Sequence, residues 1–257
     1  MNLDIKKAFL SPFSERKWYV KLIFPIIMTF LISLNNHKLL HLSHPYNAII
    51  GIISFTSFLL LAGFYIQFQH NEIRNEFHLL PGLKFKVSQY FEYGFFSTFI
   101  IFFYVVPIFL LSIIPQTVAS IAMLILRFSH LASVLNMLIT SISVLVGVFI
   151  LLIDMFLLIA CIFALNAYAD DLKMNINVNF KETFKFMSKV KAEVFIYALI
   201  AIPLDAITVF MTTFFIHIPI LLIRSNLIFI IAPIFITFMQ LMKFNLGAQL
   251  YKVAKSK

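Results

Sequence analysis

Two acidic residues, Asp205 and Asp154, stand inside long apolar segments of this chain. A charged side chain at the centre of a membrane helix costs about 2.5–3.5 kcal/mol on insertion scales. Asp205 follows Pro203 by two residues within segment 194–215, and a proline in a helix frees a backbone carbonyl and bends the chain. A carboxyl group beside such a bend can carry a proton or bind a cation. The alternative is a protonated Asp205 that only hydrogen-bonds a neighbouring helix.

Asp154 lies toward the inner part of segment 131–165. Two neighbouring carboxyl groups can share one proton, so Asp154 is a candidate partner for Asp205. The alternative is an acid that reaches the aqueous interface. Pro25 and Pro107 stand inside two other apolar segments, as Pro203 does, and the three prolines are candidate helix kinks.

Three histidines, His37, His41 and His44, fall in one short polar stretch. Their spacing of four and three residues places them on one face if the stretch is helical. Three imidazoles can ligate zinc or copper. No cysteine or carboxylate joins them, so they are weak metal candidates, and the sequence predicts neither a metal nor a cofactor.

The chain carries none of the sequence signatures of common catalytic sites. It has no P-loop, nucleophile elbow or paired hydrolase carboxylates. We therefore expect a protein that is not an enzyme.

Composition places these residues in a membrane. The chain is 61% hydrophobic and 12% charged, whereas soluble domains carry about 25% charged residues. Its 257 residues hold six apolar segments, each long enough or nearly long enough to cross a bilayer, at 19–34, 48–68, 95–114, 131–165, 194–215 and 227–244. The sequence predicts one integral membrane domain over residues 1–257, an all-α polytopic bundle of six transmembrane helices. Pro115 is expected to end the third helix, with 118–126 as a short re-entrant or interfacial piece.

The basic residues alternate across these segments. All but three of the 20 Lys and Arg residues fall in alternate flanks, the exceptions being Lys38, Arg127 and Arg224. By the positive-inside rule both termini lie in the cytoplasm. The net charge of +9 therefore fits anionic lipid headgroups at the cytoplasmic face rather than nucleic acid.

Two segments on the predicted inner side, 83–93 and 179–190, mix aromatic residues with Lys and are expected to form interfacial helices. Similar sequences recur along the chain, and alternate apolar segments end alike, at 62–65, 164–168 and 247–251. This pattern predicts three parallel hairpins, each made of an interfacial helix and two spans.

The same motifs resemble a known family. Gly63-Phe64-Tyr65, then Leu80-Pro81-Gly82-Leu83, then Phe91-Glu92-Tyr93-Gly94 resemble the pattern of the prokaryotic membrane family called domain of unknown function 4013. The segments 8–13 and 245–251 look like its opening and closing motifs. This chain departs from the family in having Gly82 where Trp is usual, and Gly-Phe-Tyr for Gly-Tyr. The resemblance implies a multi-span protein of the prokaryotic cytoplasmic membrane and implies no activity.

The sequence favours transport or handling of a small molecule or lipid. Repeated hairpins often place a site at their shared interface, where Asp205 and the prolines are expected to converge. The alternative is a non-catalytic scaffold whose basic inner helices recruit a protein partner. A lipid-modifying enzyme needs a polar cluster that the sequence does not assemble.

Overall fold

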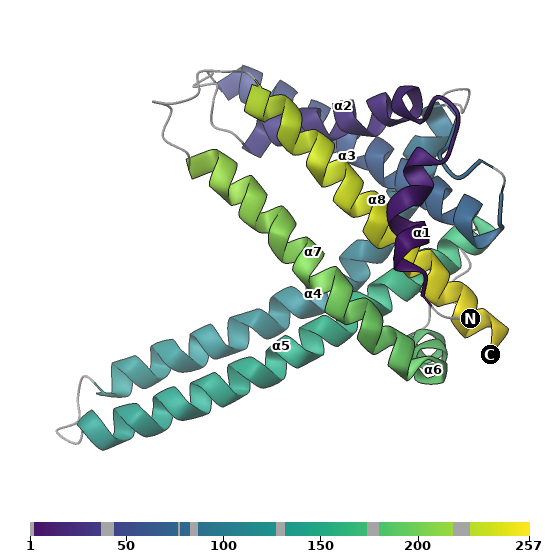
Figure 1. Ribbon diagram of the computed structural model, residues 1–257. Coiled ribbons are helices and arrows are strands. Elements are labelled where there is room, and N and C mark those ends of the chain that lie inside the picture. The colour runs from purple at the N-terminus through teal and green to yellow at the C-terminus, as the bar shows by residue number, and fades with distance from the viewer. Residues whose placement is uncertain are drawn as a thin grey trace. The chain divides into compact units, whose positions relative to one another are not determined.

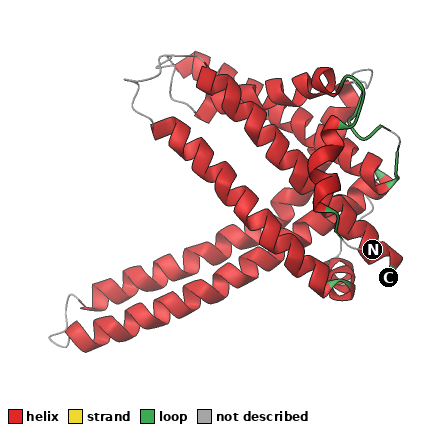
Figure 2. Cartoon of the chain, viewed as in Figure 1, coloured by secondary structure: helices red, strands yellow, loops and turns green. Residues whose placement is uncertain are grey.

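The computed structural model describes residues 3–36, 44–76, 78–82, 87–126, 132–173, 180–217 and 227–257. Over these residues the chain forms eight α-helices, one 3-10 helix and no strand. Figure 2 shows the helices in red. The elements are α1 (Ile5–Leu10), η1 (Ser11–Phe13), α2 (Trp18–Asn36), α3 (His44–Ile73), α4 (Val87–Leu126), α5 (Ala132–Asp171), α6 (Phe180–Lys189), α7 (Lys191–His217) and α8 (Leu227–Ser256). The predicted all-α fold is confirmed.

Each of the six predicted apolar segments lies in a separate long helix. Five of these helices are long and apolar enough to cross a membrane, over Tyr46–Ile73, Val87–Leu111, Val144–Asp171, Lys191–Phe210 and Ile231–Ser256. The sixth, α2, has a shorter apolar run at Trp18–Ser33. The chain is therefore a multi-pass membrane protein, and a count of six spans is consistent with the helices.

Two predicted helix boundaries are wrong. Helix α4 continues through Pro115 to Leu126, so 118–126 is not a separate piece. A proline removes only one backbone hydrogen bond, and an apolar helix tolerates that loss. Residues Val87–Tyr93 are the first turns of α4 rather than an independent interfacial helix, because the helix continues through Gly94 into the span.

The second predicted interfacial helix is confirmed as a separate element. Helix α6 ends at Lys189, and α7 begins at Lys191 after a turn at Val190. In Figure 1 α6 is seen end-on while α7 is seen from the side. A short helix that crosses the axis of the adjoining span has the orientation expected at a membrane interface.

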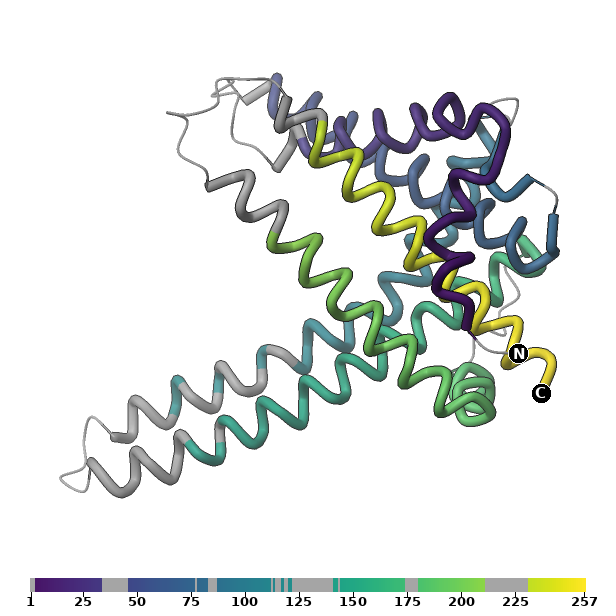
Figure 3. Tube along the Cα trace, viewed as in Figure 1, coloured from purple at the N-terminus to yellow at the C-terminus, as the bar shows by residue number. Residues whose placement is uncertain are grey.

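The chain divides into two compact units, residues 1–99 with 163–257 and residues 100–162. In the first unit α2, α3 and α8 pack against one another, α7 packs on α8, and α1 also packs on α8. Figure 3 shows the purple start of the chain beside its yellow end. The apolar core of this unit consists of Leu22, Leu61, Phe64, Tyr65, Phe68, Leu80, Tyr90 and Leu241.

The second unit consists of parts of α4 and α5. Its described surface is rich in large apolar side chains, among them Phe102, Phe109, Leu145 and Phe149, each more than half exposed. Such a surface suits contact with acyl chains, because lipid replaces water as the solvent around a membrane helix.

The three similar span ends in the sequence hold the same residue type. Tyr65 of α3, Tyr168 of α5 and Tyr251 of α8 come from these span ends, and all three are buried. The internal repeat itself stays a prediction.

Helices α3 and α4 cross at two glycines. A Cβ atom added to Gly63 would lie 1.9 Å from the backbone oxygen of Tyr90, and one added to Gly94 would lie 1.7 Å from that of Leu59. These distances are far below van der Waals contact. The two helix backbones therefore touch, as small residues permit in membrane proteins.

Alanine at Gly63 or Gly94 should force these helices apart and lower the free energy of unfolding by about 1–3 kcal/mol, the usual cost of overpacking. The matched control is Gly51→Ala in α3, where an added Cβ meets nothing within 4 Å. Thermal unfolding in detergent measures the effect. Equal melting temperatures for Gly63→Ala and Gly51→Ala would refute the close crossing.

Candidate functional site

Asp205 of α7 forms an ion pair with Lys243 of α8. The Lys243 ammonium donates to both carboxylate oxygens, with Nζ–Oδ1 at 2.8 Å and Nζ–Oδ2 at 2.6 Å. Both residues lie near the middle of their helices, which are 27 and 30 residues long. At 1.5 Å per residue these helices reach about 40 and 45 Å, beyond a hydrocarbon core of about 30 Å. Asp205 therefore lies inside the apolar part of α7, whereas Lys243 lies at the end of the apolar run of α8, just before the polar residues Asn245 and Gln249.

The pair is only partly buried by its own unit. The Asp205 side chain is 46% exposed and that of Lys243 is 21% exposed. Ile202, Pro203 and Ile207 around Asp205 are also exposed. A polar ligand that reaches α7 could thus contact both charges.

Lys243 was not recognised from the sequence as a site residue. It stands one residue before the end of the predicted sixth span at Phe244, and the charge count includes it with the basic C-terminal flank. Helix α8 instead continues to Ser256, and this extension moves Lys243 toward the helix centre. A count of basic residues cannot distinguish a lysine in the flank from one inside the end of the helix, because both support the same topology.

Asp154 belongs to the second unit. Its side chain is half-buried, and its Oδ1 atom has no hydrogen-bond partner within the described part of the chain. Pairing of Asp154 with Asp205 stays a prediction.

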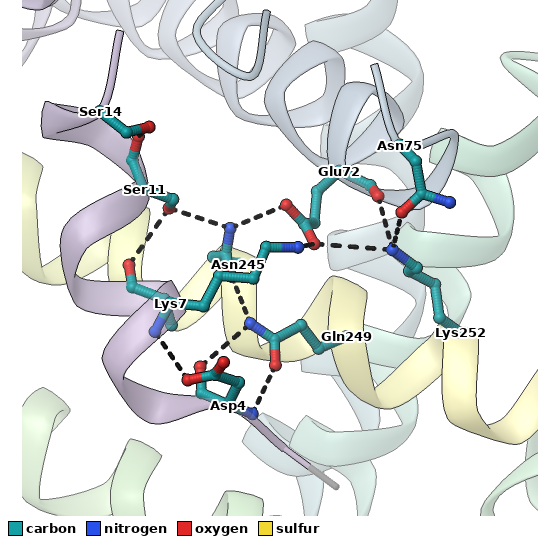
Figure 4. A network of polar contacts seen from close by, with 10 residues as sticks. Asp4, Lys7, Ser11, Ser14, Glu72, Asn75, Asn245, Gln249 and Lys252 are labelled. Carbon is teal, nitrogen blue, oxygen red and sulfur yellow. Dashed lines mark hydrogen bonds and ion pairs between the residues drawn. The ribbon is translucent and has the colours of Figure 1, made fainter. Parts of the chain in front are cut away.

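A second polar group lies where α1, α3 and α8 meet, and Figure 4 shows it from close by. Its centre is Glu72, whose side chain is 1% exposed. The Glu72 Oε1 atom lies 2.6 Å from Lys7 Nζ and 3.6 Å from Lys252 Nζ. Asn245 donates to Oε2 at 3.3 Å. One buried carboxylate thus holds two cations and an amide from two other helices.

The N-terminal helix is attached to α8 by reciprocal hydrogen bonds. The Asp4 backbone N–H donates to Gln249 Oε1 at 2.8 Å, and Gln249 Nε2 donates to the Asp4 carbonyl at 3.2 Å. Asn245 donates to Ser11 Oγ at 3.2 Å. Asp4 also accepts from the Lys7 backbone N–H and so caps α1. The amides of α8 therefore fix the position of α1.

Asp170, at the end of α5, is a second buried carboxylate with two cations. Lys255 pairs with its Oδ2 atom, and Arg74 lies 3.2 Å from Oδ1. Arg74 also donates to the Asp170 carbonyl, and His70 Nδ1 lies 2.6 Å from the Ala169 carbonyl. A carbonyl only accepts, so Nδ1 of His70 carries the proton. These basic groups satisfy carbonyls that the end of a helix leaves free.

Glu15 is a third buried carboxylate of this kind. Lys21 pairs with Glu15 Oε2, and His78 lies 3.7 Å from the same atom. The Leu80 backbone N–H donates to Glu15 Oε1, and its carbonyl accepts from Lys21 at 3.0 Å. The Leu-Pro segment at 80–81 is thus held by an ion pair from the N-terminal region.

A profile of the family DUF4013, described as a protein of unknown function, matches residues 47–218. The chain belongs to this family. The match includes the motifs at 63–65, 80–83 and 91–94, while those at 8–13 and 245–251 lie outside it. No curated protein and no solved structure matches the chain.

The structure gives physical roles to several residues of these DUF4013 motifs. Gly63 and Gly94 form the helix crossing, and Leu80 is buried in the core. Pro81 is buried as well, whereas Gly82 is only partly buried. Residues of these three motifs therefore contribute to the packing of the helices.

The polar C-terminal end of α3 was not recognised from the sequence. Residues 67–72 read Gln-Phe-Gln-His-Asn-Glu, and all but His70 are buried. The sequence did carry a sign of this polar end. Several amides and an acid directly follow a long apolar segment, and such groups need hydrogen-bond partners if they are buried. Gln69 is fully buried, and neither end of its amide has a partner among the described side chains.

The predicted histidine group is not tested. His37 and His41 lie outside the described residues, and of His44 only the helical backbone is described. Over the described side chains no three histidine, cysteine or acidic residues are grouped to hold a metal ion. Pro25 and Pro203 lie inside α2 and α7, and α4 passes through Pro107.

Glu72→Gln should detach α1 and destabilise the first unit. Removing one partner of a buried ion pair costs about 3–5 kcal/mol, because the remaining charges lose their compensation. The matched control is Glu76→Gln, since Glu76 is exposed and follows α3 by three residues. Hydrogen exchange should show residues 4–10 less protected in Glu72→Gln alone. Unchanged protection would mean that Glu72 does not hold α1.

Proposed function

We propose that this protein transports or handles a small molecule or lipid within the membrane, and that Asp205 and Lys243 form its polar contact. The observation that carries the proposal is an ion pair between an acid inside the apolar segment 194–215 and a lysine at the end of the apolar segment 227–244. An unpaired Asp205 would be costly inside an apolar helix. Pairing reduces the cost but leaves the exposed sides of both groups available to a ligand.

The three hairpins offer a comparison that supports a functional role. Asp205 stands two residues after a mid-span proline, and the same position after Pro25 and Pro107 holds Ile27 and Phe109. Lys243 stands eight residues before Tyr251.

The positions eight residues before Tyr65 and Tyr168 hold Ser57 and Ala160. Two of the three hairpins therefore form without a charged pair at these positions. If the hairpin structure itself required a charged pair at these positions, all three hairpins would carry one. The Asp205–Lys243 pair thus occurs only in the third of these predicted hairpins, which supports a role beyond the shared fold.

The proposal includes the location of the protein in the prokaryotic cytoplasmic membrane, with both termini in the cytoplasm. Helix α6 exposes Lys181, Lys185 and Lys189, spaced four residues apart along one side. Anionic lipid headgroups attract such a row at about 1 kcal/mol per residue. The same row favours the second candidate function, a non-catalytic scaffold that recruits an acidic partner at the cytoplasmic face.

Native mass spectrometry in lipid nanodiscs separates the two functions. The variant Asp205→Asn/Lys243→Gln removes both charges without leaving one unpaired. It should lose a small-molecule or lipid adduct that the wild-type protein carries. The matched control is Glu193→Gln/Lys257→Gln, which removes an ion pair between α7 and the C-terminus.

The control should keep the adduct. An adduct present equally in all three proteins would exclude the Asp205–Lys243 pair as the contact. A stoichiometric protein companion without any such adduct would favour the scaffold. Circular dichroism checks that each variant is folded.

Cysteine labelling tests the orientation. Cys161 is the only cysteine and is buried, so Cys161→Ala gives a background without thiols. A membrane-impermeant maleimide should label Asn47→Cys in intact spheroplasts, because Asn47 is exposed at the opposite end of α3 from Glu72. Ser14→Cys and Ser256→Cys should react only after lysis. The reverse pattern would place the termini outside.

A further inference from the structure

The Asp205–Lys243 pair compensates its own charge. Lys243 contacts both carboxylate oxygens, and within the described part of the chain neither residue has another ion-pair partner. The next charged residues along the two helices are Glu193, before Asp205, and Lys252, after Lys243. Both lie at least two helical turns away, at about 1.5 Å of rise per residue.

A ligand with a single charge cannot use this pair without cost. An anion that binds Lys243 displaces Asp205, which then stays unpaired or must take up a proton. A cation that binds Asp205 leaves Lys243 unpaired in the same way. An isolated charge in an apolar environment is strongly unfavourable, so either exchange works against binding.

A ligand with one positive and one negative group avoids this problem. Its anionic group contacts Lys243 while its ammonium contacts Asp205, and the four charges then alternate in sign. We propose that the ligand of this site is a zwitterion with an ammonium and a phosphate or carboxylate group; this proposal rests on the function proposed above.

The surroundings of the pair indicate the rest of the ligand. Ile202, Pro203 and Ile207 are exposed next to Asp205, and they can contact an apolar chain. A zwitterionic lipid has both parts, and a soluble zwitterion with an apolar group shares the same chemistry. The partial exposure of both charged side chains leaves room for such a contact without unfolding either helix.

The first test uses the wild-type protein and three probes. Short-chain phosphatidylethanolamine should bind more tightly than phosphatidylglycerol, whose headgroup is anionic only. Free phosphoethanolamine, the third probe, tells the sources apart. If it binds as well as the lipid, the ligand is a soluble zwitterion; if only the lipid binds, the acyl chains contribute. Tighter binding of phosphatidylglycerol by the wild-type protein overturns the proposal without relying on any variant.

The second test uses the two single variants. For a zwitterion, Asp205→Asn and Lys243→Gln each remove one charged contact, so each should weaken phosphatidylethanolamine binding by at least about tenfold. For an anion, Asp205→Asn removes a competitor and strengthens binding, while Lys243→Gln abolishes it. For a cation the two effects are exchanged. Opposite effects of the two variants therefore overturn the zwitterion.

These results are distinct from failure of the proposed function. If an adduct depends on the pair but responds oppositely to the two variants, the function stands and the ligand class is wrong. If no adduct depends on the pair, both proposals fail. The Glu193→Gln/Lys257→Gln variant again serves as the control for removal of an α7 charge.

Discussion

Glu72 sets a condition that the rest of the first unit must satisfy. An almost fully buried carboxylate is stable only with cations and hydrogen-bond donors in contact. Here Lys7 of α1 and Lys252 and Asn245 of α8 supply them. The start and end of the chain must therefore meet at α3. Asp170 at the end of α5 and Glu15 in the turn before α2 repeat the arrangement, so three buried carboxylates of this unit are held by ion pairs.

The sequence predicted the parts of the fold that depend on hydrophobicity and on charge counting. All six apolar segments are helical, α6 is a separate element, and the family resemblance is confirmed. The errors occurred at helix ends. An apolar segment marks the part of a helix that lies in the hydrocarbon core. Helices α3, α5 and α8 continue several residues beyond their apolar segments, and these extensions are polar. Pro115 was wrongly predicted to end a helix. Proline often ends helices in soluble proteins, but membrane helices tolerate it more readily.

The partners in the candidate site could not be predicted in the same way. Lys7 and Glu72 are 65 residues apart, and Asp205 and Lys243 are 38 apart. Spacing along the chain carries no information on such contacts without the packing of the helices. Asp205 was recognised because an acid inside an apolar segment is unusual. Lys243 was not, because a lysine at the edge of a predicted span is ordinary.

The attachment of α1 to α8 has a consequence for biogenesis. Helix α1 is synthesised well before its partners Asn245 and Gln249 of α8, and Glu72 is synthesised well before Lys252. During translation Glu72 therefore lacks one of its two cations, and the amide contacts of α1 do not yet exist. Helices α1 and α3 therefore reach their final packing only once α8 is in place, and until then the N-terminal helix lacks the contacts that fix its position.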